Sequence, residues 1–133
     1  MHHKKRVNLE GTHPAIFYAL GRAEEIYIDN GQTMVVTSVN DSHENKPLSL
    51  HRQDNPKFAD NLCRAADLRT NHVPSDIVPM IFRDLVKALN PIGFDVVLHA
   101  DEWDPVTGKQ TMFQHFHIEY DPKGEESWSE EEV

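Results

Sequence analysis

The clearest pattern of hydrophobic and polar positions lies in residues 114–120, near the C-terminus. Side chains on a β-strand alternate between its two faces, so this alternating segment, bounded by Asp121-Pro122, is typical of a strand. Its predicted core face carries Gln114, Phe116, Ile118 and Tyr120. The opposite face carries His115, His117 and Glu119. Two imidazoles side by side, directed away from the apolar layer, favour a binding role for that face.

Apolar positions at helical spacing predict two helices. The first covers residues 14–28, because Pro14 suits a first helical position and Asn30-Gly31 provides a C-terminal stop. The second covers residues 75–90. Pro79 must lie in its first turn, or this helix begins later than residue 75.

The rest of the chain divides into strands and polar connections. Residues rich in β-formers predict three further strands, over 33–39, at the end of 58–68, and over 94–99. Polar composition predicts an N-terminal arm over 1–12 and loops over 40–56 and 101–111. The element order and the short connection between the last two strands favour an α+β domain. Helices would pack on one face of a small antiparallel sheet, and the histidine pair would lie on the other.

Size and charge narrow the functional classes. The chain has 133 residues, enough for one domain with a real core. We expect that domain over residues 1–123 and an acidic, disordered tail over 124–133. A net charge of -9 argues against nucleic acid as a partner, because phosphate binding requires a basic surface.

The sequence also predicts a compartment and excludes some kinds of site. No apolar run is long enough for a membrane span. Residues 1–6 are basic but lack the apolar segment of a signal peptide, so we expect the protein, as a monomer, in the cytoplasm after synthesis. The single cysteine, Cys63, excludes an intramolecular disulfide framework and a cysteine-based zinc site.

Histidine nitrogens and carboxylate oxygens are the donors that zinc takes when no thiolate is offered, and a catalytic zinc site needs three protein ligands with one open position. The strand over 114–120 supplies one or two histidines. Further ligands could come from residues 49–51 or 64–69. Asp67 lies among small and apolar residues, which is costly unless a metal, or a salt bridge to Arg64 or Arg69, compensates the charge.

Taken in order, five segments resemble the zinc D-alanyl-D-alanine carboxypeptidase family. That family includes the vancomycin-resistance dipeptidases and the phage L-alanyl-D-glutamate endopeptidases, and it shares its fold with the hedgehog signalling domain. The resemblance runs from about residue 35 to 122. The segments are Thr37-Ser38, Ser49-Leu50-His51, the Arg-Ala-Ala-Asp-Leu-Arg run over 64–69, the Phe-Asp-Val-Val-Leu run over 94–98, and the His-Phe-His-Ile-Glu-Tyr-Asp-Pro run over 115–122.

The resemblance implies a metallopeptidase in which His51, Asp67 and His117 hold Zn²⁺. Members of the family are hydrolases that use a zinc-activated water against a peptide bond, while a nearby group transfers the proton to the leaving amine. The implied substrate is a peptidoglycan stem peptide, cleaved next to a D-amino acid. A short form of this kind fits a phage endolysin, which degrades the cell wall after release from the cytoplasm.

The chain also departs from the family pattern. Gln114 stands where an acidic residue often lies, so the catalytic base could be His115, His99 or Glu102. The usual substrate-binding arginine is missing, which leaves His43, Arg64 and Ser49 as candidates, with Arg52 as a further choice. His51 and Asp67 are sixteen positions apart, wider than usual, and an insertion over 54–61 would explain the spacing.

These departures keep other functions open. One is a metal-binding structural module of a virion that has the fold without the chemistry. Another is a zinc peptidase acting on a different small peptide. Iron and nickel also accept two imidazoles and a carboxylate.

Overall fold

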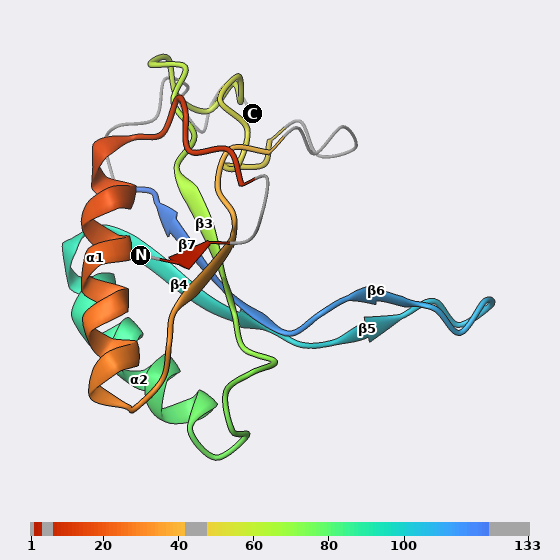
Figure 1. Cartoon of the computed structure of the whole chain (residues 1–133). Helices are drawn as coiled ribbons and strands as arrows, with labels where there is room; N and C mark the ends of the chain where they lie inside the picture. The colour runs from red at the N-terminus through yellow and green to blue at the C-terminus, as the bar shows by residue number, and fades with distance from the viewer. Residues whose placement is uncertain (1, 4–6, 42–47, 123–133) are drawn as a thin grey trace.

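The central strand of the structure is β7 (His115–Tyr120), which lies between β3 (Ala65–Arg69) and β4 (Phe94–His99) and runs antiparallel to both. The structure is a computed structural model, and it describes residues 2–3, 7–41 and 48–122. The sheet has the order β1-β2-β3-β7-β4, completed by β2 (Val35–Ser38) and β1 (His2–His3). The strands expected near residues 35, 65, 94 and 115 are therefore confirmed, and the fold is α+β (Figure 1).

The register of β7 separates an apolar face of the sheet from a polar one. Phe116 lies opposite Leu68 and Leu98, whereas His117 lies opposite Asp67 and Val97. Register partners in antiparallel strands project to the same side, so apolar side chains gather on one face and imidazoles and carboxylates on the other. This confirms the alternation predicted from the sequence.

Two helices cover the apolar face (Figure 1). The first, α1 (Pro14–Asp29), begins where Ala15 N donates to His13 Nδ1 at 3.0 Å, and Gly31 follows it with φ of 72°. The second, α2 (Val78–Leu89), begins later than residue 75, because Pro79 occupies its first turn. A short 3₁₀ helix, η1 (Asn90–Ile92), follows α2. Neither helix in the described part of the chain combines the length and apolar character needed to cross a bilayer.

A continuous apolar core joins the helices to the sheet. Its largest fully buried side chains are Tyr27, Phe116, Ile16, Leu20, Met34, Leu68, Ile81, Leu85, Leu89, Ile118, Val36 and Val39. On the opposite face a small apolar cluster of Leu50, Phe58 and Ala65 covers one end, where Ala65 is the register partner of Glu119. Val97 on the same face is 43% exposed, so that part of the polar face is open to a ligand.

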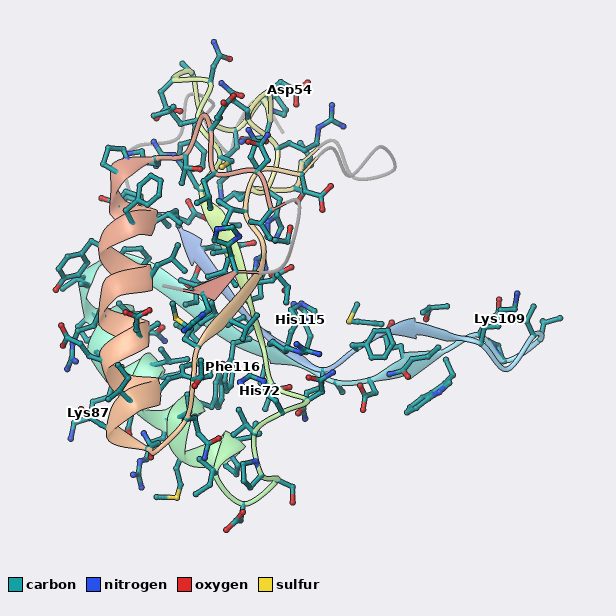
Figure 2. All side chains as sticks on the ribbon, in the orientation of Figure 1. Asp54, His72, Lys87, Lys109, His115 and Phe116 are labelled. Atoms are coloured by element: carbon teal, nitrogen blue, oxygen red, sulfur yellow. The ribbon has the colours of Figure 1, made fainter. Side chains whose placement is uncertain are left out.

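The segment over 101–111 is not the loop that its composition predicted. It forms a ribbon of β5 (Glu102–Trp103) and β6 (Gln110–Met112), which projects from the body of the molecule (Figure 1). Asp104 Oδ1 accepts a hydrogen bond from Val106 N at 2.7 Å, and Gly108 has φ of 71°, so polar turn residues close a hairpin here. Figure 2 shows Lys109 near the tip of this ribbon.

The N-terminal arm also differs from the expectation. His2 and His3 pair in parallel with Val35 and Val36, so the arm adds a short strand, β1, to the edge of an otherwise antiparallel sheet. The tail over 124–133 and His43 lie outside the described residues.

The two faces predict a large loss of stability when a core side chain is truncated and a small one when a side chain on the open face is truncated. Ile118→Ala leaves a cavity in the core and is expected to lower the free energy of unfolding by ~2–5 kcal/mol. Val97→Ala on the open face is the matched control and should change it by about 0.5 kcal/mol or less. Urea denaturation of each variant in excess chelator measures both values. Equal costs would contradict the assignment of the two faces.

Candidate metal centre

His51 reaches the polar face from a loop that is fixed to the start of β3. Arg64 N donates to Leu50 O at 2.6 Å, and His51 N donates to Ser49 Oγ at 3.3 Å. Asp41 N donates to His51 O at 3.0 Å from the other side. The His51 side chain is 4% exposed. These bonds hold the ring of His51 over β3, despite its unusual distance from Asp67 in the sequence.

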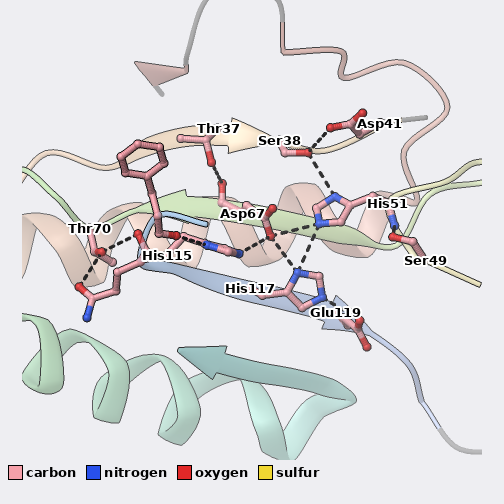
Figure 3. Close-up of polar contacts among 12 residues, drawn as sticks. Thr37, Ser38, Asp41, Ser49, His51, Asp67, Thr70, His115, His117 and Glu119 are labelled. Carbon is pink, nitrogen blue, oxygen red and sulfur yellow. Dashed lines mark hydrogen bonds and ion pairs between the residues drawn. The ribbon is translucent and has the colours of Figure 1, made fainter. Parts of the chain in front are cut away.

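His51, Asp67 and His117 meet at one point on the polar face (Figure 3). Asp67 Oδ1 lies 3.1 Å from His51 Nε2 and 2.8 Å from His117 Nδ1. The two ring nitrogens are 3.3 Å apart. Asp67 and His117 are direct register partners on β3 and β7, so the sheet itself sets the distance between them.

The outer nitrogens of both rings fix where the protons lie. His51 Nδ1 is 2.8 Å from the carbonyl oxygen of Val39, and His117 Nε2 is 2.7 Å from Glu119 Oε1. Both oxygens only accept, so each outer nitrogen must donate. In the neutral rings the inner nitrogens then carry lone pairs directed at the Asp67 carboxylate. Three electron-pair donors converge, which is the arrangement that a cation stabilises.

The partners of the two rings also match those of known metal ligands. A histidine that binds a metal usually donates its other ring N–H to a carboxylate or a backbone carbonyl. Glu119 fills this position for His117, and Val39 O fills it for His51. Two imidazoles and one carboxylate suit Zn²⁺. The three side chains therefore form a group that can hold a metal ion.

The protonation equilibria reflect the crowding of these groups. Burial on its own lowers the pKa of His117, but hydrogen bonds to Asp67 and Glu119 outweigh it and raise the pKa to about 9. Burial on its own raises the pKa of Asp67, but hydrogen bonds from His117 and His51 hold that pKa far below its ordinary value. Without metal, a proton on His117 therefore compensates the charge of Asp67 at neutral pH.

Asp67 does not form the salt bridge that its sequence context offered as an alternative. Arg64 Nη2 pairs with Asp60 Oδ2 at 2.7 Å, and Arg69 Nε donates to Asn71 Oδ1 at 2.6 Å. The Asp67 carboxylate bonds to the two histidines instead. Its position therefore agrees with the ligand alternative.

A second group of carboxylates lies on the same face. It consists of Asp95, Glu119 and Asp121. Glu119 bonds to His117, which lowers the pKa of Glu119, and Asp121 pairs with Lys57. These two carboxylates already have basic partners, so the histidine-containing group is the better metal centre.

The three candidate bases lie at different places around the centre. His115 Nε2 is 3.7 Å from Asp67 Oδ1. The ring of His99 lies 5.0 Å from that of His115 and 5.6 Å from that of His117, between centroids. Glu102 is exposed on the ribbon. Burial and then the nearby His115 lower the pKa of His99, which favours its neutral form.

The predicted substrate-binding residues do not gather at the centre. Arg64 is 3% exposed, stacks over the Phe58 ring at 3.7 Å and pairs with Asp60. Ser49 accepts the hydrogen bond from His51 N and so supports the loop. His43 lies outside the described residues. Arg64 and Ser49 are thus engaged in holding the structure around His51.

A groove of about 640 Å³ opens beside Asp67 and His115, and no pattern in the sequence indicated it. One wall comes from β2 and β3, including Ser38 and Arg69, and the other from the base of the ribbon, including Phe113. Arg69 could have been found by period-two spacing, because it lies two residues after Asp67 on the same strand. The wall formed by the ribbon could not have been found in this way, because its hairpin was predicted as a loop.

Comparisons with protein-family models, with curated proteins and with solved structures each gave no match to the chain. The resemblance to the carboxypeptidase family therefore rests on the sequence segments alone.

The protonated state of His117 predicts how zinc affinity depends on pH. Its pKa of about 9 lies above the ordinary value of 6.5, so zinc must displace a proton at pH 7. The affinity should rise about tenfold per pH unit between pH 7 and 9 and then level off. Competition with a chromophoric chelator measures this slope.

The raised pKa of His117 also stabilises the metal-free protein. This contribution is fully present below the unfolded pKa of His117 and is lost as pH rises through about 9. Glu119→Gln is the control variant, because it removes a charge that holds the proton on His117. Its affinity curve should level off at lower pH. An affinity in the native protein that does not change between pH 7 and 9 would contradict the assigned protonation.

Proposed function

We propose that the protein is a zinc-dependent peptidase that hydrolyses stem peptides of peptidoglycan next to a D-amino acid. The observation that carries this proposal is the convergence of His51, Asp67 and His117 beside an open groove. A centre meant only to fix the fold would be closed, whereas a catalytic centre needs access for substrate and water. The lining of the groove by Asp67 supports the catalytic alternative.

The proposed zinc ion, held by these three side chains, would polarise the substrate carbonyl and lower the pKa of water. His115 is the best placed of the three candidate bases. Its Nδ1 lies 2.8 Å from Phe113 O and must donate to it, which leaves Nε2 to accept a proton on the side of Asp67. That nitrogen can take a proton from the attacking water and return it to the leaving amine.

The identity of the substrate comes from the resemblance to the carboxypeptidase family. The segments that carry the resemblance include all three proposed ligands, and the ligands meet in space although they are far apart in sequence. An enzyme with this substrate would act as an endolysin once it is released to the wall.

The second candidate function is a metal-binding structural module without catalysis. It is favoured by Gln114, which replaces the acidic residue that the family often has. Thr70 Oγ1 donates to Gln114 Oε1 at 2.9 Å, so this side chain is held to the end of β3. A module of this kind would bind zinc and cleave nothing.

The two functions differ in what chelation does to activity. The zinc-loaded protein is expected to release products from purified peptidoglycan or from a peptide ending in D-Ala-D-Ala, and the chelated protein to release none. Mass spectrometry of the soluble products measures cleavage, and restored zinc should restore it. Full zinc occupancy without any released product would favour the structural module.

The base is located by three single substitutions, His115→Ala, His99→Ala and Glu102→Ala. Loss of the true base should lower kcat by about 10²-fold or more while zinc stays bound, and we expect this effect for His115→Ala. Turnover and zinc content are measured on the same preparations. A full loss of turnover in Glu102→Ala, with His115→Ala unaffected, would contradict the assignment.

A further inference from the structure

Arg69 differs from every other arginine in the described residues. The other guanidinium groups each pair with a carboxylate: Arg22 with Glu25, Arg52 with Asp54, Arg64 with Asp60, and Arg83 with Asp84. The guanidinium of Arg69 is exposed and makes no ion pair within the described ranges. Its Nε donates to Asn71 Oδ1 at 2.6 Å, which orients the group and leaves its two terminal nitrogens without a described partner.

The position of Arg69 places this cation beside the metal centre. It follows Asp67 by two residues on β3 and is the register partner of His115 on β7, so all three residues belong to the polar face of the sheet. All three also line the groove of about 640 Å³. Met112 and Phe113 line the same groove from the base of the ribbon, and Figure 2 shows His115 where the ribbon leaves the body.

The charge of the protein makes an exposed guanidinium in this groove informative. The chain has 22 acidic and 13 basic residues, so carboxylates are abundant. Each of the other described arginines forms an ion pair with one of them. A guanidinium presents a planar fork of donors that matches a carboxylate with two parallel hydrogen bonds. The terminal nitrogens of Arg69, next to the proposed metal centre, are therefore suited to bind an anionic group of the ligand.

We infer that Arg69 binds a carboxylate of the substrate and selects peptides that carry one close to the bond to be cleaved. This inference rests on the proposed peptidase function and names the feature of the substrate that the site recognises. The carboxylate could be the C-terminus of the peptide or the free carboxylate of a D-glutamate joined through its side chain. Arg69 is therefore a specificity-determining residue, in the role for which Arg64 was a candidate.

Binding of two peptide pairs to the full-length, metal-free protein tests the inference independently of cleavage. One pair is a peptide ending in D-Ala-D-Ala, as the free acid and as the C-terminal amide. The other contains a side-chain-linked D-glutamate, with its carboxylate free or amidated. For one pair, the acid should bind roughly 10–100-fold more tightly than the amide, and the pair that shows the difference identifies the source of the carboxylate.

Three variants assign this preference to Arg69. Arg69→Gln should bind acid and amide equally, Arg69→Lys should keep part of the preference, and Arg22→Gln, which removes the same charge from α1, should keep all of it. Circular dichroism and zinc content check that each variant is folded. A preference that survives Arg69→Gln overturns the inference, and so does a wild-type protein that prefers the acid in neither pair.

Cleavage by the zinc-loaded wild-type protein is measured separately. An acid preference that depends on Arg69, in a protein that cleaves neither peptide, would refute the peptidase function and leave the carboxylate site established. Cleavage without an acid preference would refute the carboxylate site and leave the peptidase function standing.

Discussion

The register between β3 and β7 is the constraint on which the rest of the molecule depends. It sets His117 opposite Asp67, and Phe116 opposite Leu68. One pairing builds the polar centre and the other builds the core, and both follow from the same hydrogen-bonded ladder. A slip of one residue would turn every side chain of β7 to the wrong face. The packing of α1 and α2 against Phe116 and Ile118 therefore also holds the ligands in position.

The centre requires a proton or a cation among its donors, and the groups around it hold those donors in place. A buried carboxylate and two imidazoles with inward lone pairs repel one another unless a proton or a cation lies among them. The surrounding acceptors, Val39 O and Glu119, hold the rings in this orientation. The helices cover only the opposite face (Figure 1), so the centre lies on the side of the sheet that also lines the groove.

The sequence was most informative where local periodicity and tertiary structure agree. The alternation in β7 and the stripes of α1 and α2 were read correctly, because burial on one face imposes the same period on sequence and structure. The prediction of a loop over 101–111 was wrong, because the strands of the β5–β6 ribbon contact mainly one another and no apolar period marks them. Arg64 was offered as a substrate ligand, yet its stacking on Phe58 and pairing with Asp60 depend on how distant segments meet. The groove likewise depends on how distant segments meet, so local sequence patterns do not reveal it.

The separation of the ligands along the chain has a consequence for the order of events during biosynthesis. His51 and His117 are 66 residues apart, and Asp67 and His117 are 50 apart. Contacts of such long range form late, after loop closure has been compensated by core burial. The nascent chain therefore cannot capture an ion with this donor set until β7 has emerged and joined the sheet.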